Sequence, residues 1–191
     1  MDFAEAVDGA REAVFEWCRE HSALPRIPLV LYMAWIGVRH LADTDYASWF
    51  AALNLGIHEG GHLLFGWQPW QFLTVAGGTL LQLAAPLASA WMFCRQPDYF
   101  AVTICGGWLS TNLYGIATYA ADAQELDLPL VNVGGGEADH DWAYMLEAVG
   151  LIEWDHTLAF LIRVVAFAVM WSSVAAAVAM LRLMARRGMN D

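Results

Sequence analysis

The sequence predicts an all-α membrane protein, and three observations lead to that fold class. Hydrophobic residues make up 59% of the 191 residues and charged residues only 15%, whereas a soluble domain has about 25% charged residues. The charges are also unevenly placed, because residues 47–121 carry only Glu59, Arg95 and Asp98. So few charges cannot cover a soluble surface. Finally, several apolar runs approach or reach the length of a membrane-spanning helix.

We expect an amphipathic helix at the N-terminus, followed by about five transmembrane helices. Residues 1–24 place apolar side chains at helical spacing with acidic residues between them, which is typical of a helix lying on a membrane interface. Pro25 and Pro28 end this helix. The apolar runs that follow cover residues 28–41, 46–67, 70–94, 99–121 and 157–181.

The chain therefore divides into three parts. Residues 1–24 form the amphipathic helix, residues 25–182 form a helical membrane domain with a polar, acidic loop at 122–156, and residues 183–191 form a basic tail. We expect an integral membrane protein that has membrane lipid as a partner. The net charge of −11 argues against a nucleic-acid partner, because a phosphate backbone would be repelled. The three cysteines show no CxxC spacing and predict neither a disulfide framework nor a zinc ribbon.

The second apolar run contains the segment His58-Glu59-Gly60-Gly61-His62. On a helix, positions i and i+4 share one face, so the two imidazoles can bind one Zn²⁺ ion. Glu59 can then accept a proton from a water at the zinc, whose pKa the metal lowers to about 7. Ionisable residues inside a span cost several kcal/mol unless they are paired or functional. The alternatives are a buried soluble helix with hydrogen-bonded histidines, and a metal site without catalysis.

A catalytic zinc site commonly has three protein ligands, so a third is expected here. If the spans alternate in direction, the ends of runs 46–67 and 99–121 reach the same membrane face, where Asp122 and His140 also lie. Imidazole suits zinc well, which slightly favours His140, and Asp141 is the next candidate. Alternatively, Asp122 is a helix-end residue that meets water, and His140 and Asp141 mark a helix N-terminus capped by Asp139 or Asp141.

Two uncharged polar residues, Gln82 and Asn112, lie in the middle of apolar runs. They form hydrogen bonds between helices, or they line a cavity and bind a substrate or its oxyanion. Glycine pairs at 77–78 and 106–107 also lie inside apolar runs, where small residues allow helices to pack closely.

An HExxH segment in an apolar helix, followed by two further spans and a late acidic residue, resembles the site-2 protease family of intramembrane zinc metalloproteases. The similar part covers residues 46–122. The resemblance implies that His58 and His62 bind the zinc, that Glu59 is the catalytic base and that Asp122 is the third ligand. Asn112 is similar to the asparagine that precedes the aspartate in that family.

The resemblance implies hydrolysis of a peptide bond in or near the membrane, with a transmembrane peptide or protein as the substrate. It also implies a location in a bacterial inner membrane. The alternative function is a zinc-binding membrane protein without protease activity, which acts as a sensor or scaffold. Glu59 separates the two, because a scaffold needs only the metal ligands whereas a hydrolase also needs the base.

Overall fold

The computed structural model describes residues 2–129 and 140–187, and its regular structure is helical throughout. No strand occurs among these residues, which confirms the predicted all-α class. The glycine run at 134–136, Asp139 and the last four residues of the tail lie outside the described ranges. In chain order, the helices are α1 (Phe3–Glu20), η1 (Leu24–Arg26), α2 (Ile27–Ala42), α3 (Phe50–Phe65), α4 (Gln71–Arg95), α5 (Tyr99–Ala121), α6 (Asp141–Ala148), η2 (Ile152–Trp154) and α7 (Asp155–Arg187).

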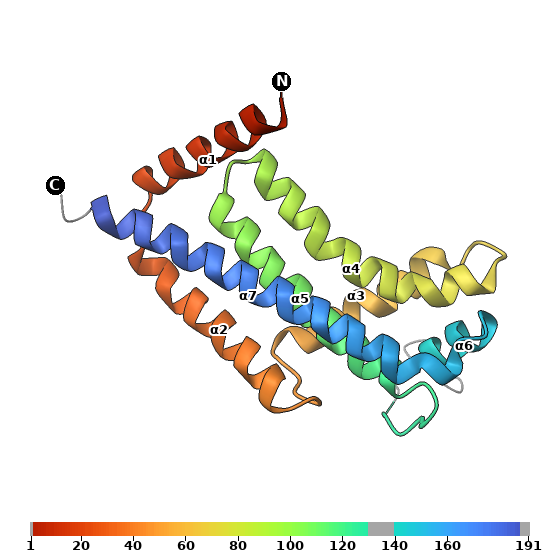
Figure 1. Cartoon of the computed structure of the whole chain (residues 1–191). Coiled ribbons are helices and arrows are strands. Elements are labelled where there is room, and N and C mark those ends of the chain that lie inside the picture. Colours follow the sequence, from red (N-terminus) through yellow and green to blue (C-terminus); the bar gives the residue numbers. More distant parts are fainter. Residues whose placement is uncertain (1, 130–139, 188–191) are drawn as a thin grey trace.

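The long helix α7 runs through the middle of the molecule, antiparallel to α5 (Figure 1). Ser110 of α5 donates a hydrogen bond to the carbonyl oxygen of Ala166 of α7 at 2.7 Å. At Gly106 the two helices approach so closely that a Cβ atom would overlap the hydroxyl of Ser173. An apolar core joins this pair to α1 and α2; its buried members are Cys18, Val30, Met33, Ile36, Phe100, Met170, Val174, Ala177, Met180 and Met184.

Helices α3 and α4 form a hairpin whose backbones touch at glycines. A Cβ atom on Gly61 would overlap the carbonyl of Gly77 and lie 2.7 Å from the Cα atom of Gly78. A Cβ atom on Gly77 would lie 2.7 Å from the ring of Phe65. The glycines at 77–78 therefore allow close helix packing, as their position in an apolar run predicts.

A polar contact also ties α3 to α5. The indole nitrogen of Trp108 donates a hydrogen bond to Asn54 Oδ1 at 2.8 Å. Asn54 is buried and lies one helical turn before His58. The segment that carries the HExxH residues is therefore fixed against α4 on one side and α5 on the other.

Two helical segments, Gln71–Arg95 and Ile152–Arg186, are long and apolar enough to cross a membrane. Helix α5 has 23 residues, whereas α2 and α3 have 16 residues each. At 1.5 Å per residue, sixteen residues extend about 24 Å, less than the roughly 30 Å hydrocarbon core of a bilayer. The prediction of about five spans therefore stays a prediction. The polar segment 122–156 is also partly helical, because it contains α6 and η2.

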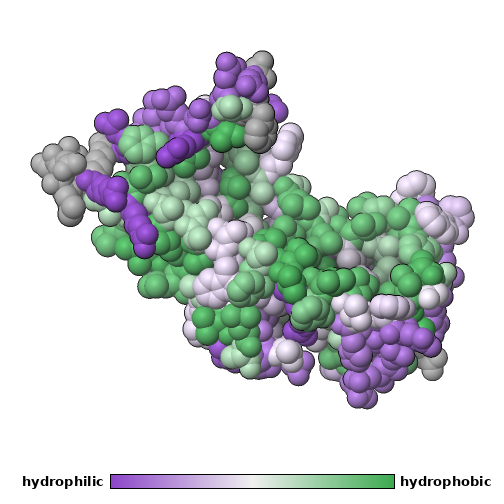
Figure 2. Space-filling model, viewed as in Figure 1, coloured by the Kyte–Doolittle hydropathy of each residue, from purple (hydrophilic) through white to green (hydrophobic). Residues whose placement is uncertain are grey.

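Hydrophobic residues cover the middle of the visible surface, and hydrophilic residues gather over α1 and near α6 (Figure 2). Helix α7 exposes a run of large apolar side chains, which includes Phe160, Leu161, Val164, Val165 and Phe167. Runs of exposed large apolar side chains like this one are typical of a surface that contacts a membrane or a partner. The molecule thus has an apolar middle between polar ends.

The α3–α4 contact gives a direct test of the packing. Gly61→Ala should lower the stability by about 1–3 kcal/mol, because the new methyl group forces two backbones apart. Gly56→Ala is the matched control on the same helix, since a Cβ atom there meets nothing within 4 Å. It should leave the stability unchanged or raise it by up to about 1 kcal/mol. Thermal unfolding of both variants in detergent measures the difference, and equal midpoints would contradict the packing described here.

Candidate metal centre

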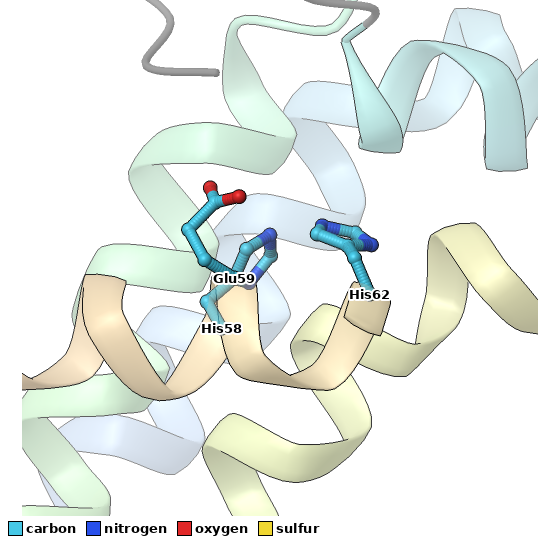
Figure 3. A group of neighbouring side chains, drawn as sticks. All are labelled: His58, Glu59 and His62. Carbon is cyan, nitrogen blue, oxygen red and sulfur yellow. The ribbon is translucent and has the colours of Figure 1, made fainter. Parts of the chain in front are cut away.

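His58, Glu59 and His62 project from the same side of α3 (Figure 3). Their potential ligand atoms all lie within 4.8 Å of one another. His58 is buried, whereas Glu59 and His62 are partly buried. The i and i+4 spacing on a continuous helix accounts for the alignment of the two imidazoles.

Helix α4 fixes the orientation of both imidazole rings. His58 Nδ1 lies 3.0 Å from Gln82 Oε1, and His62 Nδ1 lies 3.0 Å from the carbonyl oxygen of Thr74. Each Nδ1 therefore faces an acceptor to which it can donate a proton; in the neutral tautomer that a metal ligand needs, the lone pair then lies on Nε2. Gln82 thus forms a hydrogen bond between α4 and α3, which is one of its two predicted roles, and its partner is one of the two candidate zinc ligands.

The two Nε2 atoms converge on one carboxylate oxygen. Asp141 Oδ2 lies 2.8 Å from His58 Nε2 and 3.1 Å from His62 Nε2. Tetrahedral zinc with ligands at about 2.0–2.1 Å places neighbouring ligand atoms about 3.3 Å apart, so these three donors need to move by only a few tenths of an ångström. Two imidazoles and a carboxylate form a donor set that suits zinc.

The lack of a side chain at Gly78 keeps the space beside these nitrogens open. A Cβ atom at this position would lie 2.6 Å from His58 Nε2 and 2.7 Å from His62 Nε2. Any larger residue would push the imidazoles away. The three donors and the open space beside them therefore fit a bound metal ion.

Asp141 is held in the ionised form that a metal ligand needs. Burial of Asp141 raises the pKa of its carboxyl group, but hydrogen bonds from His58 and His62, which form when their Nε2 atoms carry protons, outweigh this effect and hold the pKa below its ordinary value. Asp141 is buried at the first residue of α6. Helix α6 thus places the buried carboxylate of Asp141 beside the histidines of α3.

The other two sequence candidates pair with each other. His140 Nε2 lies 3.2 Å from Asp122 Oδ2. Both carboxylate oxygens of Asp122 also accept hydrogen bonds from the backbone, from the amides of Asp127 and Leu128 at 2.9 and 3.1 Å. Neither His140 nor Asp122 forms an ion pair with His58 or His62 in the described part of the chain. Their role as metal ligands stays a prediction.

His140 has a local role at the start of α6. Its Nδ1 accepts a hydrogen bond from the amide of Ala143 at 3.1 Å and caps the helix. In the neutral ring the proton is then on Nε2, which faces Asp122. Burial lowers the pKa of the His140 imidazole, and the nearby Asp122 carboxylate partly offsets this effect. The alternative that α6 begins here agrees with the structure, but the capping side chain is His140 rather than Asp141.

Tyr119 of α5 contacts Asp141, and its ring lies near the rings of His140 and His58. Nothing in the sequence marks this tyrosine except its position near the end of an apolar run. Its hydroxyl accepts a hydrogen bond from the amide of Asp141 at 3.1 Å. Its ring centre lies 4.3 Å from that of His140 and 6.2 Å from that of His58. Tyr119 therefore anchors the first residue of α6 over the HExxH segment.

Asn112 is fully buried, but it does not join two helices through its amide nitrogen. Its Nδ2 donates to the carbonyl oxygen of Trp108 in the same helix at 3.2 Å. Its Oδ1 has no hydrogen-bond partner among the described residues. The structure thus does not bring Asn112 into hydrogen-bond contact with the histidine pair.

Comparisons with protein-family models, with curated proteins and with solved structures give no match.

The geometry predicts which carboxylate binds the metal. Asp141→Ala should weaken zinc binding by more than about 100-fold, because loss of a direct ligand costs more than loss of a residue that only orients one. Asp122→Asn is the matched control, since it also removes a buried carboxylate near α6. Competition with a zinc chelator in detergent measures both affinities. If Asp122→Asn loses zinc and Asp141→Ala keeps it, Asp122 is the third ligand.

The anchoring role of Tyr119 gives a second prediction. Tyr119→Phe keeps the ring but loses the hydroxyl that fixes Asp141, and it should weaken zinc binding by about 10–100-fold. Tyr114→Phe is the control on the same helix, because the buried hydroxyl of Tyr114 has no hydrogen-bond partner among the described residues. It should leave the zinc affinity unchanged. Equal affinities for the two variants would show that the Tyr119 hydroxyl does not position Asp141.

Proposed function

We propose that this chain is an intramembrane zinc metalloprotease-like hydrolase that cleaves a peptide bond in or beside the membrane. One observation carries the proposal: the Nε2 atoms of His58 and His62 meet at Asp141 Oδ2, while α4 holds both Nδ1 atoms as donors. A histidine pair kept for structural reasons alone does not need this arrangement of acceptors behind the rings. Metal-binding histidines almost always have it.

Each residue has a distinct task in this proposal. His58, His62 and Asp141 hold the zinc, and Gln82 and the Thr74 carbonyl keep the imidazoles in the right tautomer. When bound, zinc supplies Lewis acidity, which polarises a carbonyl group and lowers the pKa of a water.

Glu59, beside His58, accepts a proton from the attacking water and passes it to the leaving amine. Its carboxylate is partly exposed and lies within 4.8 Å of the potential ligand atoms of both histidines. No described residue forms a hydrogen bond with it, which leaves its oxygens available to water.

The position of the site supports chemistry near one membrane face. Exposed tryptophans, Trp67, Trp70 and Trp154, gather where α3 ends, α4 begins and α7 begins. Exposed tryptophans of this kind are typical of the membrane interface. His62 precedes Trp67 by five residues, so it lies roughly 8 Å below that interface. Water and an extended substrate segment can reach this depth without crossing the bilayer.

An integral membrane location follows in this proposal from the two long apolar helices and the exposed apolar surface. Helices α2, α3, α4, α5 and α7 make up about five spans. The two shorter ones, α2 and α3, are accommodated by local thinning of the bilayer. The resemblance to site-2 proteases suggests a transmembrane peptide or protein as the substrate, and a bacterial inner membrane as the location.

The test of the function separates the base from the ligands. Glu59→Gln should keep the zinc affinity but lower peptide cleavage by about 10²–10⁴-fold, because the amide cannot accept a proton. Glu16→Gln, an exposed change on α1, is the charge-matched control and should keep full activity. Purified protein in liposomes is incubated with a library of transmembrane peptides, and mass spectrometry identifies the fragments.

The outcomes of this experiment are distinct. Cleavage by the wild type that is absent with Glu59→Gln supports the hydrolase. Zinc binding without any cleavage supports the zinc-binding sensor or scaffold instead. Equal cleavage by the wild type and Glu59→Gln contradicts Glu59 as the base.

A further inference from the structure

A second concave site lies apart from the metal centre. It is a cavity of about 550 Å³ between η1, α2, α4, α5 and the start of α3, within the volume range of small-molecule sites. Its walls are mainly apolar and include Leu29, Phe50, Phe93, Ile104 and Trp108. On α5 it reaches from Phe100 to Trp108, whereas the metal centre lies near Tyr119. Trp108, the groove residue of α5 nearest to Tyr119, precedes it by eleven residues, which correspond to about 16 Å of helix, so the two sites are separate.

One end of this groove carries two opposite charges. Arg26 and Asp98 both line it, yet they form no ion pair with each other. The guanidinium of Arg26 lies 5.2 Å from the ring centre of Trp17 and 5.6 Å from that of Phe100, which fixes its position. Asp98 uses Oδ1 to cap α5 at the amide of Ala101. The Arg26 guanidinium and the Asp98 carboxylate thus both lie at this end of the groove.

The charged end of the groove lies beside the amphipathic helix α1, because the Arg26 guanidinium packs over the ring of Trp17 of that helix; Figure 1 shows α1 at one end of the bundle. Amphipathic helices of membrane proteins lie at the level of the lipid headgroups. The apolar part of the groove extends along α5 for about 12 Å from this level towards the middle of the bundle. The groove is therefore charged at the level of the headgroups and apolar closer to the middle of the bundle, as a phospholipid leaflet is.

We propose that this groove binds an acyl chain of a zwitterionic phospholipid, with the phosphate beside Arg26 and the ammonium group beside Asp98. The two opposite charges match both groups of such a headgroup, whereas Asp98 would repel a purely anionic one. The proposal rests on the membrane embedding of the proposed function, but it does not depend on zinc.

Photo-crosslinking of the full chain in nanodiscs tests this site. One preparation contains phosphatidylethanolamine with a diazirine on its acyl chain, and the other contains phosphatidylglycerol with the same label. After irradiation, mass spectrometry maps the modified residues. Phosphatidylethanolamine should label Phe93, Ile104 and Trp108 about tenfold more than the exposed Phe160 and Leu161 of α7. The anionic lipid should show no such concentration.

Two pairs of variants make the result decisive. Ile104→Trp fills the groove and should abolish its labelling, whereas Leu161→Trp, on the exposed face of α7, should not. Arg26→Gln should lower the labelling of the groove by both lipids, because the phosphate that they share loses its partner, while Asp98 keeps the preference for phosphatidylethanolamine. Asp98→Asn keeps a capping side chain but should shift the preference towards phosphatidylglycerol.

The proposal is overturned by uniform labelling of groove and α7, by equal labelling with both lipids, or by crosslinks between two copies of the chain in place of lipid adducts. If Ile104→Trp does not fold, the lipid preference of Asp98→Asn still decides. Zinc affinity measured on the same samples keeps this result apart from the metal site, because a vacant groove with bound zinc contradicts only the lipid proposal.

Discussion

The close approach of α3 and α4 is the constraint on which the candidate site depends. Two helices can meet backbone to backbone only where side chains are missing, and Gly61, Gly77 and Gly78 provide this place. The same approach brings Gln82 and the Thr74 carbonyl within hydrogen-bond distance of the two imidazoles. The glycines therefore do more than allow packing. They set the distance at which α4 can orient the histidines and leave space beside them.

The carboxylate comes from a different part of the chain and is fixed by a different network. Asp141 belongs to α6, which lies 83 residues after His58. The Tyr119 hydroxyl holds its amide, and the neighbouring His140 is held by Asp122 and by its cap on α6. These contacts place two acidic residues and two further polar rings around the histidine pair.

The two ends of the bundle differ in chemistry although the same helices build both. At one end, the last turns of α3 and α5 and the first residue of α6 gather histidines and carboxylates. At the other end, α5 and α4 line an apolar groove with an arginine and an aspartate at its mouth. Trp108 belongs to the groove and also donates to Asn54, one turn before His58. Helix α3 is thus in contact with both ends.

The sequence alone determined the helical class, the order of the helices and the HExxH pair, because these follow from local periodicity and spacing. It also indicated the close packing at the glycine pairs, since small residues inside apolar runs have few other uses in a helix bundle. Which of Asp122, His140 and Asp141 contacts the histidine pair depended on the tertiary structure, because all three lie near the same end of the bundle. Only the start of α6 decides that Asp141 points at the histidines while His140 turns back to cap the helix. The roles of Tyr119 and of the Thr74 carbonyl could not be predicted from the sequence either. A lone tyrosine and a backbone oxygen acquire such roles only when distant helices are packed together.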